Sequence, residues 1–108
     1  MLEKDAIVKV LLIYKQTKLV TRPEVGLMLG KSVGTIAGIC RDYDITGWPD
    51  VSPEVRQLRK CCFLLTPVDA VIPRLCPNPK ASPDEFRCVE HVHAIYQLLP
   101  PPVPPEEQ

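Results

Sequence analysis

The sequence is poor in aromatic residues and has no net charge. Only 6% of its 108 residues are aromatic although 45% are hydrophobic, so a core can form but has few large side chains to anchor it. Its 13 basic and 13 acidic residues cancel, which argues against a protein that holds nucleic acid mainly by bulk positive charge. No run of about 18 apolar residues is present, and the N-terminus lacks a basic lead before a cleavable apolar segment. We therefore expect a cytoplasmic protein without membrane contacts.

Hydrophobic periodicity predicts two helices near the N-terminus. The first should cover residues 2 to 16, where apolar side chains recur at the i, i+3, i+4, i+7 spacing of one helical face. These side chains are Ile7, Val10, Leu11 and Tyr14. The second should begin at Thr21, which forms a capping-box pattern with Glu24, and should be closed by Gly30.

A third helix is predicted from Ser32 to about Asp44. Ser32 can cap it, and its buried stripe is expected to consist of Ile36, Cys40 and Tyr43. Only a Gly-Lys turn separates it from the second helix, and the small Gly26 would let two crossing helices approach closely. This arrangement is typical of a helix-turn-helix unit.

Prolines divide the rest of the chain. Ser52 and Pro53 predict a short connector helix to about residue 60, and four prolines between residues 61 and 82 leave loops or short strands. A capping-box pattern from Ser82 predicts a last helix to about residue 99. The chain is thus expected to comprise a helix-turn-helix module (1–48), a connector helix (49–60), a Cys/His module (61–99) and a disordered Pro-rich tail (100–108). The alternative for the tail is a ligand of a proline-recognition domain.

The cysteines and histidines of the second half predict a structural zinc site. Five cysteines without a secretion signal indicate metal ligation or free thiols rather than disulfides. Three thiolates and one imidazole complete a tetrahedral Zn²⁺ set, and the preferred ligands are Cys62, Cys76, Cys88 and His91. Cys61 and His93 are alternative ligands. Zinc would stabilise a Pro-rich segment whose apolar surface is too small to offset its ordering entropy.

Other interpretations of these residues are open. The cysteines could be ordinary buried core residues, or one could be a nucleophile with His91 or His93 as its base. No oxyanion motif or acidic orienting residue accompanies such a pair, and four protein ligands would leave a zinc ion no open position for chemistry. We therefore do not expect an enzyme or a small-molecule substrate.

In order and spacing the chain resembles the GcrA family of bacterial and phage transcription regulators, over about residues 3 to 97. The family combines a three-helix reader with a Cys-x-Trp-Pro segment, a Phe-Cys-Gly segment and a Tyr-Cys-x-x-His-x-x-x-x-Tyr segment. Residues 21–30 match its second helix, residues 32–38 its recognition helix and residues 88–96 its closing segment. The fold expected is mainly α: a three-helix helix-turn-helix module plus a small zinc-binding module of loops or short strands with a C-terminal helix.

The chain departs from the family pattern on the recognition helix. Val33, Gly34 and Ile39 stand where the family usually has Arg, Asn and Lys, and Asp42 takes a position that is often basic. Phe63-Leu64 replaces Trp-Pro after the first cysteine. The zinc module therefore matches the family better than the DNA reader does.

The resemblance implies a transcription regulator in the cytoplasm of a bacterial or phage-infected cell. Its partners would be promoter DNA and the primary sigma factor of RNA polymerase. The candidate DNA-binding residues are Lys18, Arg22, Lys31, Ser32, Thr35 and Arg41. Alternatively the third helix only packs, and an exposed apolar strip at Val33 and Ile39 binds protein, which would make the chain an adaptor or inhibitor that contacts RNA polymerase without reading DNA.

Overall fold

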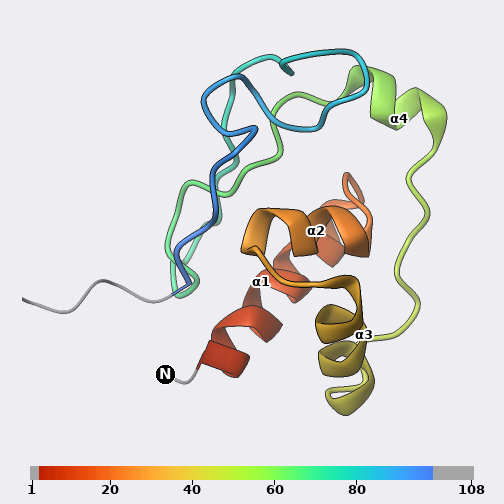
Figure 1. Cartoon of the computed structure of the whole chain (residues 1–108), viewed down its shortest axis with the longest axis vertical. Coiled ribbons are helices and arrows are strands. Elements are labelled where there is room, and N and C mark those ends of the chain that lie inside the picture. The colour runs from red at the N-terminus through yellow and green to blue at the C-terminus, as the bar shows by residue number, and fades with distance from the viewer. Residues whose placement is uncertain (1–2, 99–108) are drawn as a thin grey trace, which may run out of the picture.

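A computed structural model describes residues 3 to 98, and helices are the regular elements of this range (Figure 1). They are α1 (Glu3–Thr17), α2 (Arg22–Leu29), α3 (Val33–Asp42) and α4 (Pro53–Leu58). The predicted packing of three N-terminal helices is confirmed. None of the described helices has the length and hydrophobicity needed to cross a bilayer. The predicted Pro-rich tail lies outside the described residues.

Local capping interactions set the ends of α2 and α3, as the sequence predicts. Thr21 Oγ1 accepts a hydrogen bond from the Glu24 backbone N–H at 3.4 Å, and the Glu24 carboxylate accepts one from the Thr21 N–H at 2.9 Å. Gly30 ends α2 in the left-handed conformation with φ 68°, and Ser32 Oγ caps α3 by accepting from the Thr35 N–H at 3.1 Å. The turn between the helices is therefore defined by its own residues.

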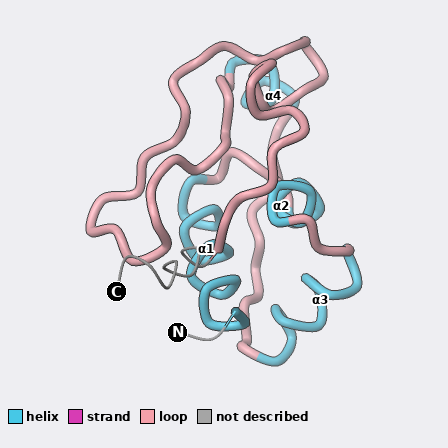
Figure 2. Tube along the Cα trace, turned by 60° about the vertical axis from the view of Figure 1, so that its left-hand side comes forward, coloured by secondary structure: helices cyan, strands magenta, loops and turns pink. Residues whose placement is uncertain are grey.

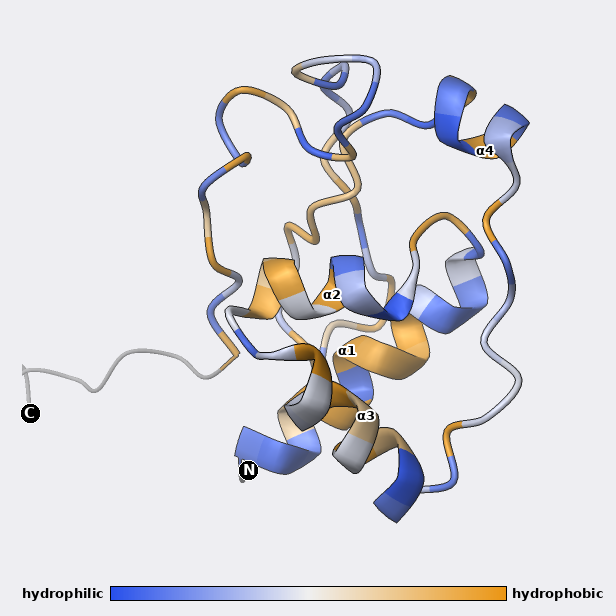
Figure 3. Ribbon diagram, turned by 45° about the vertical axis from the view of Figure 1, so that its right-hand side comes forward, coloured by the Kyte–Doolittle hydropathy of each residue, from blue (hydrophilic) through white to orange (hydrophobic). Residues whose placement is uncertain are grey.

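The three helices turn their apolar faces toward one another (Figure 3). A Cβ on Gly26 would lie 3.0 Å from the Lys31 carbonyl oxygen, so the glycine permits the close approach of the α2–α3 turn. Two predictions for α3 are wrong. Ile39 is buried, not part of an exposed strip, and Tyr43 is 43% exposed, not part of the buried stripe. Tyr43 lies after the last helical residue, where the backbone has already left the helical path.

Beyond α4 the chain is mainly loop (Figure 2). Residues 61–65 run antiparallel to residues 74–78 and exchange backbone hydrogen bonds of 2.8 to 2.9 Å with them. A single bridge between Leu64 and Leu75 is the β-structure found among residues 3 to 98. We call the segment from residue 61 to residue 78 the hairpin.

The predicted last helix is wrong: residues 82 to 98 form turns and irregular chain. Some of their backbone groups close isolated turns, as between the Ala94 N–H and the His91 carbonyl at 3.0 Å, and others bond to distant partners instead of following a helical ladder. The Phe86 carbonyl accepts from the Cys62 N–H at 2.7 Å, and the Tyr96 N–H donates to the Met28 carbonyl at 2.7 Å. The Glu85 carboxylate accepts from the Phe86 N–H at 2.9 Å rather than capping a helix. These long-range bonds satisfy groups that a helix would otherwise pair locally.

Candidate metal centre

Four side chains of the C-terminal half converge on one point. They belong to Cys61, Cys76, Cys88 and His91, and their ligand atoms all lie within 4.8 Å of one another. The Cys76 and Cys88 sulfurs are 3.9 Å apart, and His91 Nδ1 lies 3.5 Å from the Cys61 sulfur and 3.2 Å from the Cys88 sulfur. Tetrahedral zinc bonds of about 2.3 Å to sulfur and about 2.0 Å to nitrogen would separate the ligand atoms by roughly 3.5 to 3.8 Å. The buried cluster is compatible with a metal ion such as zinc.

The hairpin decides which of two adjacent cysteines joins the cluster. Successive side chains of an extended strand point to opposite faces. Cys61 and Phe63 face the cluster, whereas the Cys62 sulfur points away and donates to the Lys60 carbonyl at 3.3 Å. The preferred first ligand, Cys62, is therefore corrected to Cys61, the alternative left open by the sequence. The other alternative, His93, is exposed and outside the cluster.

A turn rather than a helix brings Cys88 and His91 together. The His91 N–H donates to the Cys88 carbonyl at 3.0 Å, so the two side chains project from one tight turn. The Phe63 ring stacks on the His91 ring with 4.6 Å between centroids and a 5° angle between planes. Stacking fixes the orientation of the imidazole. Phe63 was not among the predicted site residues, although its position two residues after Cys61 places it on the same face of an extended segment.

The thiols of the cluster differ in acidity. Burial alone would raise the pKa of Cys88, but hydrogen bonds from the Glu90 backbone N–H and the Asn78 side chain outweigh it and lower that pKa to about 6. Burial raises the pKa of Cys61 to about 12. Cys88 is thus the more acidic of the two thiols, and Cys61 favours its protonated form. A bound cation would favour ionisation of both.

Zinc binding is therefore expected to release protons at pH 7. Cys61 must lose a proton to become a ligand, so at least one proton should leave per zinc ion, and the affinity should fall as the pH is lowered. Calorimetric titration with Zn²⁺ in two buffers of different ionisation enthalpy measures the number released. Binding enthalpies that do not depend on the buffer would contradict a protonated Cys61.

The candidate DNA-binding residues lie on or next to three helices. Ser32, Thr35 and Arg41 are exposed on α3, where Arg41 lies 4.0 Å from the Asp42 carboxylate. Lys31 precedes them and pairs with the Glu3 carboxylate. Lys18 is exposed directly after α1, and Arg22 is exposed at the start of α2, where it lines a small hollow with Val33 and Ala37 of α3.

Comparison with models of protein families, with curated proteins and with solved structures found no match for this chain.

Proposed function

We propose that this protein is a zinc-stabilised transcription regulator that contacts promoter DNA through α3 and the primary sigma factor of RNA polymerase through its C-terminal half. The observation that carries the proposal is the outer face of α3. This helix follows α2 after a short turn, packs against α1 and α2, and leaves its other side open to solvent. In Figures 1 and 3 it lies on the side of α1 and α2 away from most of the C-terminal half.

The exposed side of α3 carries small side chains that would allow close contact with DNA. A Cβ on Gly34 would meet no atom within 4 Å, and Thr35 beside it is exposed. Small side chains allow the helix backbone to approach base edges, and a threonine can contact a thymine methyl group. Arg41 is 83% exposed and, although it lies 4.0 Å from the Asp42 carboxylate, its side chain can extend to a phosphate. With about four phosphate contacts, log affinity should change with log salt by a slope of only about −3.6.

The metal has a structural role in this proposal. The four protein ligands complete a tetrahedral shell and leave no open position for a reacting water. The segment they join has almost no regular secondary structure in its described residues, from Cys61 to Leu98. A structural zinc ion contributes on the order of 10 kcal/mol to folding such a segment.

Removing two basic residues of the reader should weaken DNA binding. The double variant Lys31→Ala, Arg41→Ala is expected to lower the salt slope from about −3.6 to about −1.8 because two phosphate contacts are lost. Gel shifts with a promoter duplex at several salt concentrations measure this slope. The control variant Lys60→Ala, Arg74→Ala removes the same charge from exposed sites of the C-terminal half. Equal losses in the two variants would indicate non-specific attraction and contradict the proposed reader.

A specific observation favours a second function, an adaptor or inhibitor that binds RNA polymerase through protein contacts only. The hairpin exposes three aliphatic side chains, Leu65, Val71 and Ile72, and Val71 is 97% exposed. Such residues at a protruding loop suit a protein partner better than a phosphate backbone. Under this alternative no duplex would be shifted, while purified polymerase holoenzyme would still retain the Lys31→Ala, Arg41→Ala variant in a pull-down. A shift lost in that variant would exclude it.

A further inference from the structure

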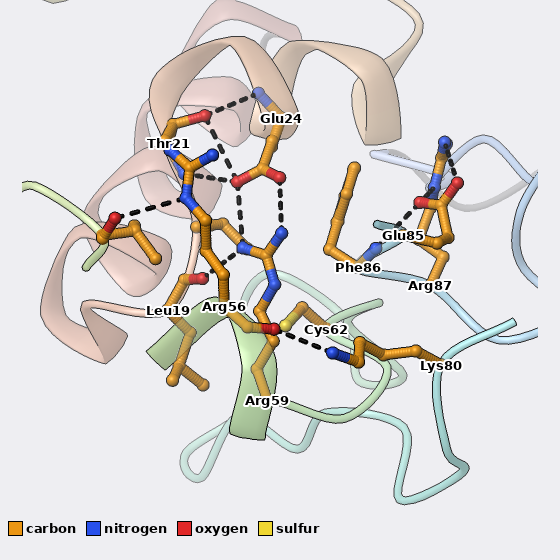
Figure 4. A network of polar contacts seen from close by, with 12 residues as sticks. Leu19, Thr21, Glu24, Arg56, Arg59, Cys62, Lys80, Glu85, Phe86 and Arg87 are labelled. Carbon is orange, nitrogen blue, oxygen red and sulfur yellow. Dashed lines mark hydrogen bonds and ion pairs between the residues drawn. The ribbon is translucent and has the colours of Figure 1, made fainter. Parts of the chain in front are cut away.

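Arg59 connects the metal cluster to the helical half of the molecule. It lies two residues before the ligand Cys61, and its side chain is 3% exposed. Its guanidinium donates to the Leu19 carbonyl at 2.7 Å and to both carboxylate oxygens of Glu24, at 3.1 and 2.8 Å (Figure 4). Glu24 is also the residue that closes the capping box of α2. One buried ion pair thus joins the start of α2 to the chain that enters the cluster.

Backbone contacts strengthen the same connection. The Tyr14 hydroxyl of α1 donates to the Cys62 carbonyl at 2.6 Å, and both groups are buried. The Cys62 N–H in turn donates to the Phe86 carbonyl, and the Phe86 ring lies 5.5 Å from the Arg59 guanidinium. The residue next to the metal ligand is therefore bonded on one side to α1 and on the other to the segment that carries Cys88.

We propose that metal occupancy of the cluster controls the stability of the α1–α3 unit through residues 59 to 62. If this unit reads DNA, as proposed above, DNA binding becomes metal-dependent. The guanidinium of Arg59 is buried, and its Nε has no hydrogen-bond partner among residues 3 to 98, so its burial is costly unless the backbone places its other nitrogens against Glu24 and the Leu19 carbonyl. The metal would hold that backbone by fixing Cys61. Without the metal, residues 61 to 98 lose their main constraint, and Glu24 and the Leu19 carbonyl lose their partner.

The single tryptophan of the chain provides a test that does not depend on DNA. Trp48 donates from Nε1 to the Val20 carbonyl at 2.9 Å and packs against the core, so its fluorescence reports the helical half. Urea unfolding of the full-length protein is followed with equimolar Zn²⁺ and after removal of metal with EDTA. We expect EDTA to lower the Trp48 midpoint by about 1 M urea or more. An unchanged midpoint, or a protein that takes up no zinc, would overturn the proposal.

Arg59 and Arg87 both lie over the Phe86 ring, so substitutions of these two arginines form a matched pair of variants. Arg87 lies over Phe86 at 4.5 Å and pairs with Glu85 at 2.9 Å, and both of these partners belong to the C-terminal half. Arg59→Met should lower the zinc-loaded midpoint and reduce the zinc-dependent shift to less than half. Arg87→Met should keep the full shift. Equal shifts in wild type and Arg59→Met would show that the connection does not run through Arg59.

If Arg59→Met does not fold, Glu24→Gln is tested instead. Glutamine can still close the capping box but lacks the charge that pairs with Arg59, so the zinc-dependent shift should again shrink relative to Glu85→Gln. A full shift in Glu24→Gln would overturn the proposal. Failure of the proposed function would be a separate result. A protein that binds no DNA can still show the zinc-dependent Trp48 shift, and a protein that binds DNA can lack it.

Discussion

Replacing Cys61 by alanine is expected to abolish stoichiometric zinc binding, whereas replacing its neighbour Cys62 leaves binding intact. The Cys61 sulfur belongs to the cluster, and the Cys62 sulfur points away from it toward the Lys60 carbonyl. Substitution of a residue that only orients a ligand weakens metal affinity by up to about 100-fold. Loss of a direct ligand should weaken zinc affinity by more than that. Competition with a chromophoric chelator measures the affinity, and metal analysis after gel filtration measures the stoichiometry.

The Cys62→Ala variant is the matched control. It removes a buried thiol of the same strand and should cost about 1 kcal/mol of stability through the small cavity it leaves. Burial raises the pKa of Cys62 to about 11, so this thiol is neutral at physiological pH. Zinc loss in Cys62→Ala with retention in Cys61→Ala would mean that the strand is shifted by one residue, because such a slip exchanges its two faces.

Replacing Tyr14 by alanine is expected to cost about 3 to 5 kcal/mol of the free energy of unfolding, as for other large aromatic core residues. Its ring is 1% exposed, and burial raises the pKa of its hydroxyl, which stays protonated and donates to Cys62. Tyr14→Phe retains the packing and should cost about 1 to 3 kcal/mol, because the buried carbonyl of Cys62 loses its donor. Chemical unfolding of zinc-loaded protein followed by circular dichroism measures both changes.

Tyr43→Ala provides the comparison. Its side chain is 43% exposed after the end of α3, so the change should stay within about 0.5 kcal/mol. Both tyrosines fall on an apolar helical spacing in the sequence. A loss at Tyr43 as large as that at Tyr14 would contradict the position of the α3 end.

The N-terminal helices could be predicted closely because their signals are local. The capping signals are the Thr21–Glu24 pair, Gly30 and Ser32. Each acts within a few residues of its own position, and each caps a helix as expected. The spacing of apolar residues in α1 likewise needs no distant partner. The same kind of signal at Ser82 was misleading because Glu85 forms bonds with Phe86 and Arg87 instead.

The cluster was partly predictable. Three thiols and one imidazole in a Pro-rich segment pointed to a metal set. Cys76, Cys88 and His91 belong to the cluster, although Cys88 and His91 lie on a turn and not on the predicted helix. Composition and spacing cannot distinguish two adjacent cysteines, because both occupy nearly the same place along the chain. The distinction depends on the hydrogen-bond register between residues 61–65 and 74–78.

The sequence by itself determined the three N-terminal helices, their caps and the kind of atoms that could bind a metal, since these depend on neighbours a few residues apart. Only the tertiary structure decided that Cys61 faces the cluster, that the chain after Pro83 is not helical, and that Arg59 pairs with Glu24 across 35 residues of sequence. Each of these outcomes depends on groups that are distant along the chain and meet only when the molecule is folded.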